Sequence, residues 1–175
     1  KEFGRVLPVL DTPGTYSLQP QGLDEEVTLK VLRGQNRFGE IRQIVAVVDA
    51  TQIDRQLYLV RQLKSQMRDQ DNGLVVALTM TDLLIRSGRE IDIQKLSELL
   101  GCPVVAIDGM TGMGVQQLLD IVSKAYPQSK AISISELNWD EPKCRLESCM
   151  AQEWARVVTR KSGDRPLWMT NWRLD

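Results

Sequence analysis

The chain has 175 residues, with 22 Lys and Arg against 23 Asp and Glu, three Cys and no His. This near-neutral, interspersed charge gives no electrostatic reason to expect nucleic acid or a lipid surface as a partner. The lack of His excludes a Ser-His-Asp triad, a Cys-His pair and imidazole metal ligands. An odd number of Cys favours a reduced, cytosolic setting, and no apolar run approaches the ~20 residues of a membrane span.

Short apolar runs rich in β-branched residues alternate with segments of helical periodicity along most of the chain. The runs predict buried strands at residues 6–10, 44–48, 74–78 and 104–107. Apolar residues at steps of three and four predict helices over residues 53–67, 93–100 and 118–122. This alternation predicts an α/β fold, with a mostly parallel sheet and helices on both faces.

The pattern changes near Tyr126 and Pro127, where we place a boundary between residues 1–127 and a smaller C-terminal segment, residues 128–175. Residues 144–160 lack Gly and Pro and predict one helix. All four Trp residues lie in this last segment, and we expect them to form a small core with the main domain rather than a docking surface. They are Trp139, Trp154, Trp168 and Trp172.

Polar and Gly-containing loops follow the predicted strands, at the edge of a parallel sheet where ligands usually bind. After the first strand comes Asp11-Thr12-Pro13-Gly14. In this Asp-x-x-Gly pattern the carboxylate can reach a hydrated Mg²⁺, and the Gly amide can approach a terminal phosphate oxygen. An ordinary turn is the alternative. We expect the four loops after the strands to converge on one edge of the sheet.

Two further loops suit recognition of a purine base. In Thr79-Met80-Thr81-Asp82 the carboxylate of Asp82 can accept two hydrogen bonds from guanine N1 and N2, or it can instead cap the following helix. The loop from Asp108 to Gly114 offers backbone amides to a base carbonyl, although its Gly spacing is not that of the dinucleotide fingerprint.

Taken together, these strings resemble the GTPase domain of the ferrous iron transport protein B (FeoB) family. The similarity is most specific in residues 11–18 and 47–59 and covers roughly residues 1–125. It implies a G-protein domain that binds GTP or GDP with Mg²⁺ at the cytoplasmic face of a bacterial inner membrane. It further implies a helical link, ending near residues 172–175, to the membrane transporter domain of the same parent protein.

The resemblance also implies roles for individual residues. Asp11, Thr12, Pro13, Gly14 and Thr15 would form the phosphate and switch motif, with Asp11 holding Mg²⁺ through water. Residues 15–27 would be the mobile segment after it. Thr79, Met80, Asp82, Asp108 and Gly109 would surround the guanine, with Asp82 selecting it.

Several positions depart from the family pattern. Thr79 stands where Asn is usual, and Asp108-Gly109 stands where Ser-Ala is usual, so a carboxylate would repel the guanine carbonyl unless it points away. Thr15 stands where many small GTPases have a water-orienting Gln, which implies slow intrinsic hydrolysis.

No Gly in the chain is followed by Lys, so the phosphate-cradling Gly-x-x-x-x-Gly-Lys-Ser/Thr loop is missing. The chain is therefore either part of a longer protein or the product of a loss of nucleotide hydrolysis, and we expect it to be inactive in isolation. The alternative function is a non-catalytic interaction module with a degenerate G-domain fold. The sequence leaves open whether the chain assembles into a homo-oligomer.

Overall fold

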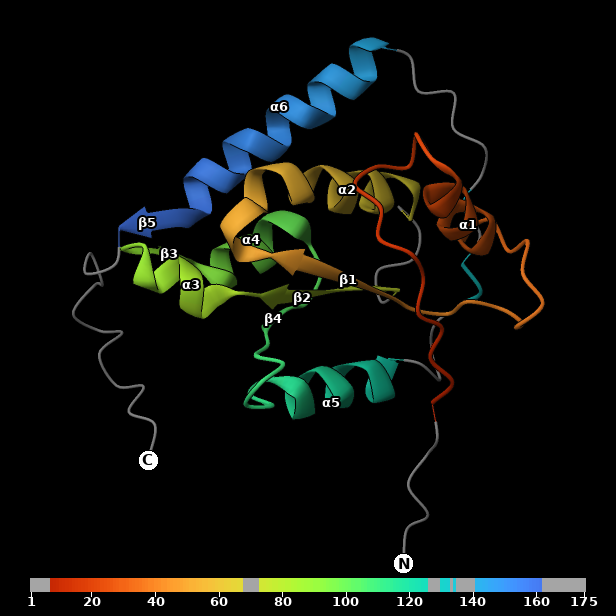
Figure 1. Cartoon of the computed structure of the whole chain (residues 1–175), viewed down its shortest axis with the longest axis horizontal. Coiled ribbons are helices and arrows are strands. Elements are labelled where there is room, and N and C mark those ends of the chain that lie inside the picture. The colour runs from red at the N-terminus through yellow and green to blue at the C-terminus, as the bar shows by residue number, and fades with distance from the viewer. Residues whose placement is uncertain (1–6, 68–72, 126–129, 133, 135–140, 162–175) are drawn as a thin grey trace, which may run out of the picture.

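The computed structural model describes residues 7–67, 73–125, 130–132, 134 and 141–161. Five strands and six α-helices alternate through these ranges (Figure 1). In chain order they are α1 (Leu23–Leu32), β1 (Ile44–Asp49), the short 3-10 turn η1 (Ala50–Gln52), α2 (Ile53–Gln66), β2 (Leu74–Thr79), α3 (Thr81–Arg86), β3 (Arg89–Ile91), α4 (Ile93–Leu100), β4 (Val104–Ala106), α5 (Val115–Ala125), α6 (Glu141–Val158) and β5 (Thr159–Lys161).

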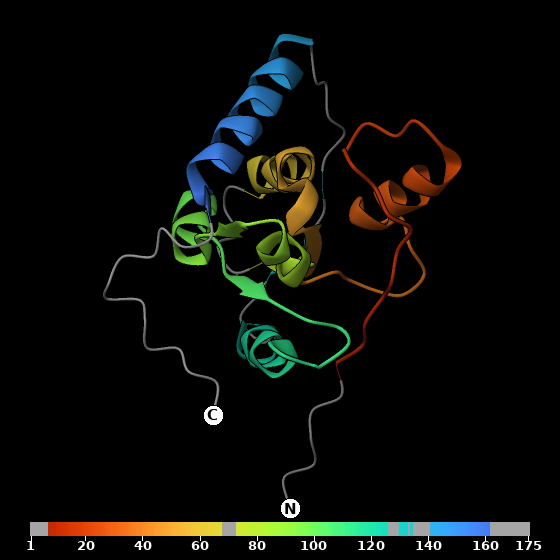
Figure 2. The ribbon, with the colours of Figure 1, turned by 60° about the vertical axis from the view of Figure 1, so that its left-hand side comes forward.

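The main sheet is parallel and has the strand order β1-β2-β4. Its central strand, β2, is buried along residues 74–78 because it has a neighbour on each side and helices on both faces. Figures 1 and 2 place α2 on one side of this sheet and α5 on the other. These findings confirm the predicted fold class and three of the four predicted strands.

The predicted first strand is wrong over its described part. Residues 7–10 are not in a strand, and the side chain of Val9 is 89% exposed. A strand is stable only where a neighbour satisfies its backbone hydrogen bonds, and within the described residues β1 pairs with β2 alone. Apolar composition alone therefore does not produce a strand here, since residues 7–10 do not pair with any strand among the described residues.

Helix α1 is not among the predicted elements, and it includes the end of the segment that we expected to be mobile. Its first turn carries Asp24, Glu25 and Glu26, and its last turn carries Lys30, which complements the helix dipole. Its buried residues are Thr28, Leu29 and Leu32. Leu29 and Leu32 join the main hydrophobic core, so packing stabilises this helix.

The C-terminal helix α6 packs along α2 (Figure 2). Ala151, Ala155 and Val158 on α6 are buried, and the two small alanines allow a close approach of the helices. Trp154 is half-buried against the core beneath the guanidinium of Arg61, whose Cζ lies 4.1 Å from the ring centroid. The other three Trp residues lie outside the described residues, so only Trp154 bears on the predicted core.

The predicted helix over residues 144–160 ends earlier, at Val158. Residues 159–161 form β5 instead, which pairs antiparallel with β3 in a second sheet. An ion pair between Arg160 and Asp92 fastens the same junction. No helix in the described ranges is both long and apolar enough to cross a bilayer.

Candidate nucleotide site

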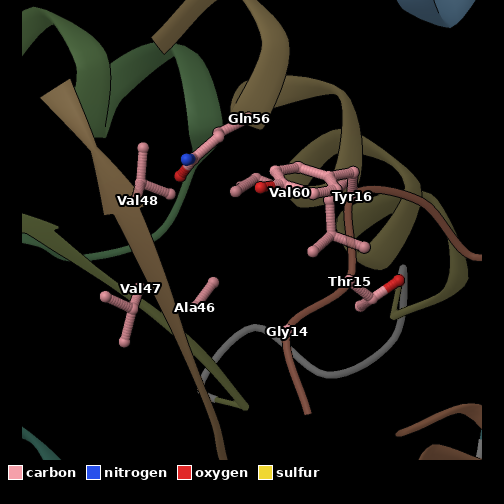
Figure 3. A pocket seen from close by; sticks show the side chains of 9 residues that line it. Gly14, Thr15, Tyr16, Ala46, Val47, Val48, Gln56 and Val60 are labelled. Carbon is pink, nitrogen blue, oxygen red and sulfur yellow. The ribbon is translucent and has the colours of Figure 1, made fainter. Parts of the chain in front are cut away.

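A pocket of about 270 Å³ lies where residues 14–16 run beside β1 and the start of α2 (Figure 3). Its wall is mostly apolar and includes Val47 and Val60. Gln56 contributes the amide in this wall, and its Oε1 accepts the backbone N–H of Asp49 at 2.7 Å. That hydrogen bond satisfies a backbone donor at the end of β1.

The Asp-x-x-Gly segment lies next to this pocket. Asp11 is exposed and has no hydrogen-bond or ionic partner among the described residues, so its carboxylate is available to a ligand. The Pro13 carbonyl accepts the hydroxyl hydrogen of Thr28 at 2.6 Å, which joins the segment to α1. Thr12 is half-buried beside them.

Gly14 is not required by the local backbone. Its φ lies outside the left-handed region, and a Cβ added there would meet nothing within 4 Å. Gly114 is the opposite case, since its φ is +76° and a Cβ would lie 1.9 Å from the Ala106 carbonyl oxygen. Space left open at Gly14 suits the close approach of a ligand oxygen to its amide.

The predicted convergence of four loops is only partly observed. The loops after β1, β2 and β4 leave the carboxyl ends of adjacent parallel strands and so share one edge of the sheet. Residues 14–16 instead lie across the pocket from residues 46–48, alongside β1 rather than beyond its end. The cause is that residues 7–10 are not held in the sheet. The loop that follows them is therefore not directed to the carboxyl edge of the strands.

The residues after β2 are positioned by the strand and by α3. The Thr79 hydroxyl donates to the Val48 carbonyl at 3.2 Å, so its oxygen lone pairs remain free to accept. Asp82 lies in the first turn of α3 but does not cap it, because the N-cap is Met80 and no side chain makes a cap hydrogen bond there. The capping alternative is therefore wrong.

Asp82 faces solvent in this structure. Its Oδ2 lies 3.7 Å from a guanidinium nitrogen of Arg86, and both side chains are more than half exposed. An exposed pair of this kind contributes little to stability, so a ligand can replace it readily. Met80, just before α3, has a φ of 57° and is the single non-Gly residue with positive φ among those described. Such strain is frequent at binding sites.

The carboxylate of Asp108 points into its own loop. It accepts the Thr111 hydroxyl at 2.7 Å and the Met110 N–H at 2.8 Å. Both hydrogen bonds lower the pKa of Asp108 below its ordinary value, and the bond from the Thr111 hydroxyl has the larger effect. The adjacent Gly109 N–H has no hydrogen-bond partner in the described part of the chain, so a base carbonyl could accept it without meeting a free carboxylate.

Residues 15–21 form the switch-like segment after Gly14, and two residues that contact it were not predicted. Glu25 accepts the Gln21 N–H at 2.7 Å and lies within 3.5 Å of the Tyr16 N–H and the Thr15 hydroxyl. These bonds, with that of Gln21 largest, lower the pKa of Glu25. Gln62 on α2 accepts the Leu18 N–H at 2.7 Å. Such contacts carry no sequence signal, because an ordinary acidic first turn and an ordinary helical Gln look the same without them.

Comparison with known proteins places the chain in a family. The family model described as ferrous iron transport protein B matches residues 2–122. The chain belongs to the ferrous iron transport protein B (FeoB) family. The resemblance expected from residues 11–18 and 47–59 is thereby confirmed.

Curated FeoB relatives agree over most of this chain. A fusion of Fe(2+) transport protein A with the Fe(2+) transporter FeoB from Porphyromonas gingivalis is 33% identical over 134 residues, which is 76% of this chain and 15% of that protein. The Fe(2+) transporter FeoB of Salmonella typhimurium is 34% identical over 155 residues, covering 83% of this chain and 18% of the relative. The chain thus spans less than a fifth of the length of these relatives.

Solved FeoB structures share the fold. The cytosolic domain of Legionella pneumophila FeoB superposes with a TM-score of 0.62 at 25% identity, covering 86% of this chain and 77% of that one. The FeoB G-domain from Methanococcus jannaschii gives 0.56 at 32% identity, covering 67% and 70%. NFeoB from S. thermophilus with bound mGMPPNP gives 0.58 at 32% identity, covering 81% and 48%. The fold is therefore that of a P-loop GTPase domain.

The described residues of this FeoB chain contain no group of three or more His, Cys, Asp or Glu side chains able to hold a metal ion. Mg²⁺ commonly needs just one or two carboxylates, with water and phosphate oxygens completing its shell. The free carboxylate of Asp11 fits that requirement.

Proposed function

We propose that this chain is the switch and base-selecting part of a GTP-binding regulatory domain in a bacterial ferrous iron uptake transporter. One observation carries the base site. Strands β2 and β4 are hydrogen-bonded neighbours, with Leu78 opposite Ala106, so Asp82 and Gly109 each lie a few residues beyond adjacent strand ends. An exposed carboxylate and an unpaired amide at one sheet edge form the acceptor and donor that guanine requires.

Each residue then has a distinct role toward the base. Asp82 leaves its weak pair with Arg86 and accepts hydrogen bonds from guanine N1 and N2, which adenine does not offer. The Gly109 N–H donates to the guanine carbonyl. Thr79 and Met80 border the base, Thr79 through the lone pairs that its bond to Val48 leaves free.

The phosphate end uses the segment beside the pocket. Asp11 holds Mg²⁺ through water, and the Gly14 amide contacts a phosphate oxygen, next to Thr12, Pro13 and Thr15. When bound, Mg²⁺ neutralises phosphate charge. The Thr15 hydroxyl donates to the Ser17 carbonyl at 2.7 Å, so it is already engaged and is a poor water-orienting group. Slow hydrolysis in the intact protein follows, and no measurable hydrolysis is expected from this chain alone, which has no Gly-Lys pair.

The wider assignment rests on the names of the relatives. They are called Fe(2+) transporters, and the solved neighbours are called cytosolic domains or G-domains. Residues 1–127 accordingly form part of the G domain, and residues 128–175 lead toward the membrane transporter domain of the parent at the cytoplasmic face of the inner membrane. Iron is the cargo of that transporter domain.

Amide chemical shifts of the 175-residue chain, titrated with millimolar GDP and Mg²⁺, test the base site. We expect shifts at Asp82 and Gly109 with GDP but not with ADP. Asp82→Asn should transfer the response from GDP to xanthosine diphosphate, because the substitution exchanges a hydrogen-bond acceptor for a donor at the base edge.

Asp120→Asn is the matched control, since Asp120 is exposed and paired to Gln116 four residues before it on α5. This variant should keep the preference for GDP. Absence of any shift in the wild-type chain would favour the non-catalytic interaction module, and equal responses to GDP and ADP would exclude Asp82 as the selecting group.

A further inference from the structure

The segment that follows Gly14 is closed into a compact loop. Its base is tied by the hydrogen bond from the Thr28 hydroxyl to the Pro13 carbonyl, and Glu25 accepts the Gln21 N–H within it. On its outer side the guanidinium of Arg55 lies 4.2 Å from the centroid of the Tyr16 ring. The contacts of Glu25 and Arg55 lie at the surface, where water competes with them, whereas Thr28 is itself buried and only its acceptor, Pro13, is exposed.

One contact holds the loop from the interior. Leu18 is 3% exposed, and its N–H donates to Gln62 Oε1 at 2.7 Å across 44 residues of sequence. Gln62 is 0% exposed on the face of α2 that meets the segment. The orientation of its amide is determined, because only the oxygen can accept the Leu18 N–H.

The amide nitrogen of Gln62 is buried without a partner in the described residues. An unpaired buried N–H is unfavourable, and an apolar residue of similar shape would avoid it. A Gln at this position is therefore poorly explained by core packing. Its acceptor oxygen is the feature that an apolar residue lacks, and the group it binds is the backbone of the switch-like segment.

We propose that Gln62 is a positioning residue for the nucleotide site, acting through Leu18. By fixing Leu18 in the core it sets where residues 14–16 lie along the pocket beside β1, and hence where the Gly14 amide is presented. Figure 3 shows this pocket between residues 14–16 and the wall formed by β1 and α2, so the segment has space into which it can shift when released. This inference deepens the proposed function and rests on it for the role of Gly14.

Amide hydrogen exchange of the ligand-free chain, resolved by residue, tests the hydrogen bond between Leu18 and Gln62. In the wild type the Leu18 amide should be the best protected between residues 15 and 20, since its acceptor is buried. Gln62→Met preserves side-chain length and burial but removes the acceptor, and should raise exchange at Leu18 about tenfold, the factor expected for one hydrogen bond. Exchange in β2 should stay unchanged.

Two further variants separate positioning from packing. Gln62→Glu, measured near pH 5 where burial keeps the carboxyl neutral, retains an acceptor oxygen and should restore protection of Leu18. Gln117→Met on the exposed side of α5 is the matched control and should change nothing. A wild-type Leu18 amide that exchanges as fast as its neighbours would refute the claim that Gln62 holds Leu18, even if Gln62→Met failed to fold. A uniform rise across β2 and Leu18 would also overturn it, by making Gln62 an ordinary core residue.

A GDP titration of the same variants tests the link to the nucleotide. Gln62→Met should reduce the GDP-induced shift at Gly14 severalfold and leave that at Gly109 unchanged. Equal responses at both glycines in wild type and variant would refute positioning. A wild-type chain without any GDP response would refute the proposed function, while the exchange result would still decide whether Gln62 holds Leu18.

Discussion

Two glycines in the candidate site should respond in opposite ways to the same substitution. Gly114→Ala places a Cβ 1.9 Å from the Ala106 carbonyl oxygen, whereas real Cβ atoms stay beyond 3.0 Å, so the loop must move by more than 1 Å. The φ of +76° adds the left-handed penalty of about 1–2 kcal/mol for a residue with a side chain. With about 1–3 kcal/mol for the steric overlap, the free energy of unfolding should fall by about 2–5 kcal/mol.

Gly14→Ala meets neither penalty. A Cβ there has nothing within 4 Å, and the φ lies outside the left-handed region. Alanine restricts the unfolded chain more than glycine does, so the variant should be more stable than the wild type by about 0.4–1 kcal/mol. If Gly14 is present for a phosphate oxygen rather than for the fold, the same variant should weaken the response of the chain to GDP and Mg²⁺.

Urea unfolding followed by circular dichroism measures both effects, provided that the slope with denaturant stays constant. Stability should decrease in Gly114→Ala and increase in Gly14→Ala. A loss of more than about 1 kcal/mol in Gly14→Ala would show that the fold itself needs glycine there, against the geometry on which the phosphate role depends. A Gly114→Ala variant as stable as the wild type would refute the described path of the loop after β4.

Two other predictions concern the core and the cysteines. Leu57 on α2 is 0% exposed, so Leu57→Ala should lower the free energy of unfolding by about 2–5 kcal/mol, whereas Leu119→Ala on α5, at 48% exposure, should lower it by less than about 1 kcal/mol. Similar losses in both would contradict the described core. Burial raises the pKa of the Cys102 thiol from its ordinary 9.0 to about 11, so the stability it contributes is lost as the pH rises through that interval. Iodoacetamide near pH 8 should accordingly modify exposed Cys149 at least about tenfold faster than Cys102, as followed by peptide mass spectrometry, and equal rates would exclude the buried thiol.

Local sequence was sufficient to predict the elements that their own residue pattern specifies. Helix α2 was predictable because Leu57, Val60 and Leu63 recur on one face, and all three are buried. Strand β2 was predictable because a continuous run of β-branched and aliphatic residues suits a strand covered on both faces. The Asp-x-x-Gly string and the Thr-x-x-Asp string after β2 were likewise visible, although the second one ends inside α3 rather than in a loop, and they indicated the family.

Tertiary structure decided whatever depends on a distant partner. Residues 7–10 read as a strand but lack a neighbour among the described residues, while β3 and β5, each three residues long, exist through their pairing across about 70 residues. The carboxylate of Asp108 proved to be engaged with Thr111, and Gln62 proved to hold Leu18. Sequence alone thus indicated the candidate residues for a guanine nucleotide. Folding decided which of their polar atoms stay free for it, because hydrogen bonds between distant segments form only when the chain is packed.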